Sequence, residues 1–193
     1  MIDLNNSEFA GKEVTIFNGG TAGLVPNVTV RVEKRKIEEP ETNPLFKVFF
    51  IDERGGVVNQ AWWNFTPNEN NTEEKNKDLQ GYYISRLLHL ARAVMGKTYT
   101  FPPVESVAKA LELVMDLVAN NSSDKKFNVF VTYGTTRKPS KYLNVRYFNF
   151  IELAQEGCKS LMTPSNVDLM ERLQADQPST PTPSDPGTDW TTL

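Results

Sequence analysis

The sequence predicts a mainly β domain with a helical insert, arranged as a five-stranded barrel with two helices between its third and fourth strands. Three strand-like runs come first, two helical stripes follow, and two more strand-like runs complete the order. With 193 residues and 39% apolar side chains, the chain can bury one ordinary core. We expect residues 1–156 to form this domain and residues 157–193 to form a flexible C-terminal tail.

The strands are predicted from the alternation of apolar and polar residues, which has a period of two in a half-buried strand. In the first strand Val28, Val30 and Val32 share one face. The Gly55-Gly56 pair is typical of a tight turn, so the second and third strands form a hairpin. The five expected strands span residues 27–36, 45–52, 57–65, 127–133 and 142–153.

Two helices are predicted between the third and fourth strands. Apolar residues recur at helical spacing over residues 84–95, and Gly96 is typical of a helix end. A second apolar stripe covers residues 104–118. Both stripes are expected to face the core. Residues 66–78 are almost wholly polar, so we expect a mobile loop there.

The sequence provides little for catalysis or metal binding. The single His89 and the single Cys158 cannot make a zinc cluster. Residues 91–98 match a loose phosphate-loop pattern, but they end a helix, whereas a phosphate loop opens one. No pair of carboxylates stands in a catalytic pattern. We therefore predict that the chain is not an enzyme and holds no cofactor and no metal.

Composition indicates a cytoplasmic protein, in the host cytoplasm if the protein is viral. The lone cysteine fits a reducing compartment. The N-terminus lacks the basic and apolar regions of a signal peptide. The sequence has no run of about 18 apolar residues, so we expect no membrane span.

Charge is distributed unevenly around a net value of −3. Residues 174–193 contain three Asp and no basic residue, so the first 173 residues hold 21 basic and 21 acidic side chains. Within this neutral body, residues 125–146 carry six basic side chains and no acidic one. A local basic stripe of this kind is typical of a phosphate-binding surface.

Basic and aromatic residues share the last two strands and their connecting loop. In the predicted last strand Tyr142, Arg146 and Phe148 lie on one face, and this combination is typical of a surface that stacks bases and neutralises phosphates. The alternative is that these aromatic side chains pack against the inserted helices. Trp62 and Trp63 are adjacent in a strand, so one is expected in the core and the other exposed. The predicted nucleic-acid contacts are Arg31, Trp62, Trp63, Arg137, Lys138, Lys141, Tyr142, Arg146 and Phe148.

The element order is that of a small barrel of the oligonucleotide-binding kind. Residues 81–91 in the insert and residues 141–151 in the closing strand resemble the single-stranded DNA-binding proteins of tailed bacteriophages. The resemblance implies binding of single strands without sequence preference, in support of replication or recombination. It also implies a tail that engages replication or recombination proteins, here through Asp185, Asp189 and Trp190. The chain departs from that family in having a sparsely acidic tail and a two-helix insert.

Two other interpretations remain open. A structural or adaptor protein, such as a virion component, would use the same barrel or a β-sandwich to bind protein. The near-neutral body favours this alternative. An enzyme that acts on RNA or nucleotides would need an acid–base or metal constellation, which the sequence does not contain.

Overall fold

The chain folds as an antiparallel β-sheet with two helices, seen in a computed structural model that describes residues 15–36 and 38–172. The strands form the hydrogen-bonded path β3-β2-β1-β4-β5, and β6 pairs with β4 beside β5. In chain order the elements are η1 (Phe17–Gly20), β1 (Gly23–Lys34), β2 (Phe46–Ile51), β3 (Val57–Trp62), α1 (Glu73–Met95), α2 (Val107–Asn121), β4 (Phe127–Thr135), β5 (Lys138–Val145) and β6 (Ile151–Leu153).

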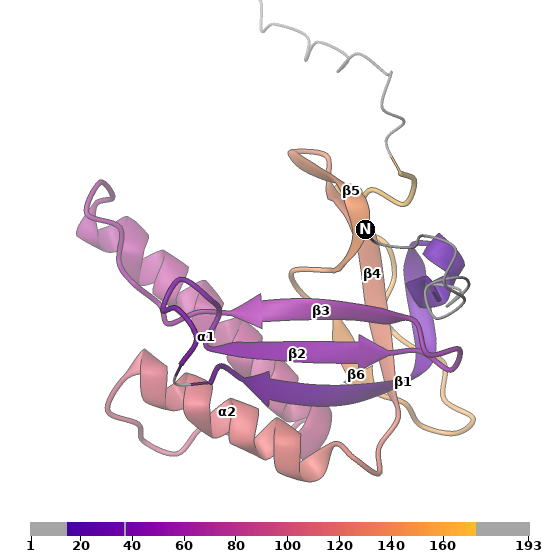
Figure 1. Cartoon of the computed structure of the whole chain (residues 1–193), viewed down its shortest axis with the longest axis horizontal. Helices are drawn as coiled ribbons and strands as arrows, with labels where there is room; N and C mark the ends of the chain where they lie inside the picture. Colours follow the sequence, from indigo (N-terminus) through magenta and orange to yellow (C-terminus); the bar gives the residue numbers. More distant parts are fainter. Residues whose placement is uncertain (1–14, 37, 173–193) are drawn as a thin grey trace, which may run out of the picture.

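Strand β1 joins two parts of the sheet because it bends. Its first half pairs with β4, its second half pairs with β2, and the β4 register shifts between Val25 and Val28. Within that interval Asn27 has a positive φ of 57°. An irregularity of this kind bends a strand and increases its twist. As a result, β4 and β5 run steeply across β2, β3 and the second half of β1 in Figure 1.

The core lies between the inner faces of the strands and the two helices. The alternating residues Phe46, Val48 and Phe50 of β2 are buried, as the period of two predicts. Leu87 and Leu90 of α1 pack against this core, and the α2 stripe adds Leu111, Val114, Met115 and Val118. The expected core-facing stripes are therefore confirmed over most of both helices, whereas Met95 and Val104 at the ends of the stripes are exposed.

The expectation of five strands in a closed barrel is not met in the described residues. The predicted last strand is divided into β5 and β6, so the sheet has six strands. The strands β3 and β5 at the two ends of the path approach each other, but no backbone ladder joins them. The sheet is therefore open at this point.

Several boundaries also differ from the prediction: for example, β1 spans Gly23–Lys34 instead of residues 27–36, and α2 begins at Val107 instead of near residue 104. Helix α1 begins at Glu73, inside the segment expected to be a mobile loop, because Thr72 caps it by accepting a hydrogen bond from the Lys75 amide. Residues 167–169, expected in the flexible tail, lie against the end of β4. The amides of Tyr133 and Thr136 donate to the carbonyl oxygens of Leu169 and Val167.

None of the helices within residues 15–172 is long and apolar enough to cross a membrane. The predicted partner-binding residues Asp185, Asp189 and Trp190 lie outside the described residues.

Candidate nucleic-acid interface

The break between β5 and β6 is a short excursion of the chain away from β4. The Arg146 amide donates to the Phe130 carbonyl oxygen at 3.0 Å, and the Phe130 amide donates to the Phe150 carbonyl oxygen at 2.9 Å. Both sides of the break thus pair with the same residue of β4. Residues 147–149 leave the sheet between them, and Asn149 closes the excursion with a φ of 47°. This excursion brings two consecutive aromatic residues, Tyr147 and Phe148, to the surface.

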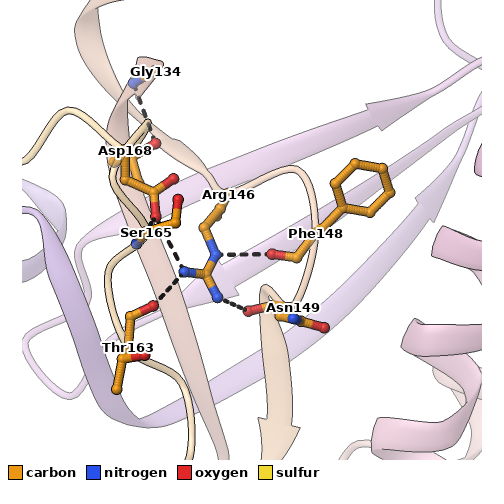
Figure 2. Close-up of polar contacts among 8 residues, drawn as sticks. Gly134, Arg146, Phe148, Asn149, Thr163, Ser165 and Asp168 are labelled. Carbon is orange, nitrogen blue, oxygen red and sulfur yellow. Dashed lines mark hydrogen bonds and ion pairs between the residues drawn. The ribbon is translucent and has the colours of Figure 1, made fainter. Parts of the chain in front are cut away.

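Arg146 holds the excursion in place. Its Nε donates to the Phe148 carbonyl oxygen at 2.8 Å, and its Nη2 donates to the Asn149 carbonyl oxygen at 2.7 Å. Its Nη1 donates to the Thr163 carbonyl oxygen at 2.8 Å and lies 3.2 Å from Asp168 Oδ2. Figure 2 shows the guanidinium at the centre of these contacts, with the Phe148 ring pointing away from it.

This environment changes the role expected for Arg146. Its side chain is only 11% exposed, and that of Asp168 is 3% exposed. The guanidinium also lies over the Phe130 ring, 4.2 Å from its centroid. Because its donors already bind protein oxygens, Arg146 is a positioning residue rather than the phosphate contact that the sequence predicted.

Tyr147 and Phe148 form an exposed aromatic ledge together with Tyr82 of α1. The Tyr147 and Phe148 ring centroids are 4.6 Å apart, and those of Phe148 and Tyr82 are 6.0 Å apart. The three residues, which we call the aromatic ledge, are 49%, 46% and 53% exposed respectively. Rings that contact one another yet remain about half exposed offer flat apolar faces to a ligand.

A cation, Arg86, adjoins the aromatic ledge. Its Nε donates to the Tyr147 carbonyl oxygen at 3.1 Å, and its Cζ lies 3.9 Å from the Tyr147 ring centroid. On its other side the Trp62 ring centroid is 4.7 Å away. Burial lowers the pKa of the Arg86 guanidinium, but an arginine stays protonated at neutral pH. The two rings thus fix a positive charge beside the aromatic ledge.

The β4–β5 hairpin supplies the other cations. Arg137, Lys138 and Lys141 are exposed, and Tyr142 at 76% is among the most exposed aromatic residues. A groove of about 910 Å³, which we call the hairpin groove, runs from this hairpin to the excursion. Its lining includes Lys138, Ser140, Asn144, Tyr147, Phe148 and Val167. The hairpin and the aromatic ledge therefore border the same depression.

The two tryptophans divide between core and surface. Trp62 is 1% exposed, so its prediction as a nucleic-acid contact is wrong. Trp63 is 52% exposed, and its Nε1 donates to the Thr42 carbonyl oxygen at 3.4 Å. Burial raises the pKa of Tyr83, whose hydroxyl stays protonated and donates to the Trp63 carbonyl oxygen at 2.7 Å.

Arg31 lies on another surface, the outer face of β1–β3. It forms an ion pair with Glu33 at 2.9 Å and lies over the Phe49 ring at 5.0 Å from the centroid. Phe49 is paired with Arg31 in the sheet register and with Asn59 on the other side. On this face, the Arg31 charge is thus neutralised beside an aromatic ring.

Sequence reasoning missed three members of the site, Tyr82, Arg86 and Tyr147. Tyr82 and Arg86 are one helical turn apart, a spacing that brings them to the same side of α1. In a continuous strand Tyr147 would lie on the face opposite Phe148, because successive side chains alternate. The one signal of the break was Asn149, a polar residue that interrupted the apolar face of the predicted strand.

The described residues contain no group of three or more His, Cys, Asp or Glu side chains that is suited to a metal ion. Burial lowers the pKa of His89, whose ring lies against Phe150 with centroids 5.1 Å apart.

Comparison with protein families, with curated proteins and with solved structures finds no match to this chain.

Proposed function

We propose that this protein binds single-stranded DNA without sequence preference, protecting single strands during replication or recombination. The observation that carries the proposal is the aromatic ledge with Arg86 fixed beside it. Exposed rings stack on the faces of any base, whereas bases in a duplex are already stacked. The ledge therefore supports preference for single strands and gives no basis for reading sequence.

The cations of the hairpin suit the phosphates of the same strand. Arg137, Lys138 and Lys141 are exposed in a stretch of sequence that has no acidic residue. Lys138 lines the hairpin groove together with Tyr147 and Phe148. A strand whose bases stack on the ledge would thus pass the hairpin cations. Tyr142 and Trp63, which are both exposed, remain proposed stacking residues.

The arrangement of strands also supports an oligonucleotide-binding barrel with one open seam. Such barrels are five-stranded and partly open, and in the expected element order a helix precedes the fourth strand. Here β1 pairs with β2 and β4, α1 and α2 precede β4, and β3 approaches β5. The open seam is flanked by β5, which leads into the excursion.

Fluorescence anisotropy with a labelled oligothymidylate and a duplex of equal length tests the proposal. Four cations, Arg86, Arg137, Lys138 and Lys141, predict a slope of log K against log salt of about −3, since each single-strand phosphate contact contributes about −0.7. Affinity for the single strand should then fall roughly 60-fold between about 50 and about 200 mM salt. No binding at low salt would instead favour the adaptor function.

The site assignment is tested by Phe148→Ala, compared with Phe49→Ala. Loss of one base stack costs about 1–3 kcal/mol, so Phe148→Ala should weaken single-strand binding roughly 5- to 150-fold. Phe49 lies on the outer face of β1–β3, away from the aromatic ledge. If Phe49→Ala weakens binding and Phe148→Ala does not, the function stands but the site is on the outer face of β1–β3.

A further inference from the structure

A second groove, of about 820 Å³, lies between the end of α1, strand β6 and residues 155–163. We call it the α1–β6 groove. Its lining includes three exposed basic side chains, Arg92, Lys97 and Lys159, besides Arg146, which pairs with Asp168. Its one acidic lining residue, Glu152, accepts a hydrogen bond from Asn128 Nδ2 at 3.0 Å. The groove is therefore positively charged.

The α1–β6 groove adjoins the hairpin groove. Arg146, Asn149 and Thr163 line both cavities, so the Arg146 contacts of Figure 2 form the wall between them. The wall carries no acidic surface, because Asp168 is buried against Arg146. A polyanion that follows one groove can reach the other without passing an exposed carboxylate in this wall.

Helix α1 leads from one region to the other, and basic residues lie near both. Arg86 adjoins the aromatic ledge, Arg92 lies further along α1, and Lys97 follows the helix end. The Arg92 side chain is held in place because its Nε donates to the Tyr99 carbonyl oxygen at 2.9 Å. At about 1.5 Å per residue, the distance along α1 from Tyr82 to its last residue, Met95, is roughly 20 Å. About six nucleotides cover that length at the ~3.4 Å spacing of a stacked strand.

We infer that single-stranded DNA continues from the aromatic ledge into the α1–β6 groove, where Arg92, Lys97 and Lys159 bind its phosphates. This inference rests on the proposed function and adds a second segment to its binding path. Ala93, Ile151, Leu161 and Met162 also line the groove, and its described lining includes no Phe, Tyr or Trp. The second segment therefore binds the DNA backbone, whereas the ledge binds bases.

The first experiment compares oligothymidylates of about 4 and about 12 nucleotides, which fill one or both segments. Three further phosphate contacts should make the salt slope of the long strand steeper by about 2. The variant Lys97→Ala/Lys159→Ala should lower affinity for the long strand roughly tenfold. For the short strand, Lys97→Ala/Lys159→Ala should lower affinity no more than the control Lys36→Ala/Lys109→Ala does. The control removes the same number of positive charges outside the α1–β6 groove. Equal effects of both variants on the long strand would overturn the inference.

The second experiment uses Cys158, which is the only cysteine of the chain, is exposed and lines the α1–β6 groove. A photoreactive group attached to its thiol should cross-link the long oligonucleotide and not the short one. The control is Cys158→Ser combined with Ala119→Cys, which moves the thiol to an exposed position on α2. It should give no cross-link with either strand.

The outcomes separate the two proposals. If both oligonucleotides bind but the long one never cross-links at Cys158, the second segment is wrong and the proposed function stands. If neither oligonucleotide binds at low salt, the proposed function itself fails. A cross-link to the long strand, lost in Lys97→Ala/Lys159→Ala, is the result we expect.

Discussion

At the scale of single residues, Arg146 and Arg137 carry the same charge in different surroundings. Arg137 is exposed in the β4–β5 turn. The Arg146 guanidinium binds three carbonyl oxygens and the buried carboxylate of Asp168. A sequence pattern counts both as candidate phosphate ligands. The partners of a side chain decide its role. Two of the four partners of Arg146, Thr163 and Asp168, are 17 and 22 positions away along the chain.

Replacing Arg146 should destabilise the protein far more than replacing Arg137. Arg146→Ala leaves Asp168 buried and unpaired, a change that costs about 3–5 kcal/mol, whereas Arg137→Ala should stay within about 0.5 kcal/mol. Arg146→Lys keeps one charge for Asp168 but loses the planar fork, so it should lie between the two. Urea unfolding followed by circular dichroism gives all three values. Similar unfolding midpoints for the two alanine variants would contradict the positioning role.

His89 should make stability depend on pH. Burial lowers its pKa below the usual 6.5, and Arg146 and Arg92 add to this effect, while Glu152 and a backbone hydrogen bond at Ile151 oppose it. The unfolded chain therefore binds a proton more readily than the folded chain. This contribution to stability is complete above about pH 6.5 and is lost as the pH falls below that value.

His89 is the only histidine of the chain, so its titration can be followed directly by NMR. The free energy of unfolding should fall between about pH 7 and about pH 5.5, and His89→Gln should reduce that fall because glutamine does not titrate. An identical fall in the two proteins would show that other groups cause it.

At the scale of elements, the local geometry of β4 allows three segments to meet. Gly134 has a φ of 88°, and a Cβ atom at this position would lie within 3.4 Å of backbone atoms of Lys138, Pro139 and Ser140. The Gly134 carbonyl oxygen also accepts a hydrogen bond from the Leu169 amide. A glycine is required here because both the backbone conformation and the close approach of β5 exclude a side chain.

Gly134→Ala should therefore destabilise the protein more than Gly157→Ala. Gly157 has a φ of 74°, and a Cβ atom added there would meet no neighbouring atom within 4 Å. Its substitution carries only the cost of the left-handed conformation, about 1–2 kcal/mol. Gly134→Ala adds a steric conflict with β5. Thermal unfolding of the two variants isolates the steric part. Equal losses would mean that β5 moves away at no cost.

At the scale of the whole molecule, the distribution of charge matters more than its sum. The net charge of −3 includes three Asp in residues 174–193, and the remaining chain is neutral. The hairpin, Arg86 and the α1–β6 groove hold cations along one proposed path. A neutral body with a local basic stripe can attract a polyanion at short range, within about 10 Å at 0.1 M salt.

Removing residues 174–193 should leave affinity for single-stranded DNA equal or raise it a few-fold. The deleted segment is anionic, so it can compete with DNA for the same cations. Anisotropy at low and at high salt measures the change, which should vanish at high salt because the competition is electrostatic. A large loss of affinity would show that this segment contributes to DNA binding instead of to partner recruitment.

The sequence by itself determined most of the elements. Alternating valines predicted β1, the glycine turn predicted the β2–β3 hairpin, and two apolar stripes predicted the core faces of α1 and α2. It also located the basic hairpin, since charge and exposure follow from residue type. These features depend on neighbours within a few positions along the chain.

The tertiary structure alone decided the openness of the sheet, the excursion at residues 147–149 and the roles of Trp62 and Arg146. Each depends on contacts between residues far apart in sequence, such as Arg86 with Tyr147 or Arg146 with Asp168. A period of two or 3.6 residues gives the side of an element on which a residue lies. The period does not identify the residues of other elements that pack against that side. Those residues determine whether an aromatic ring or a cation stays free to bind a ligand.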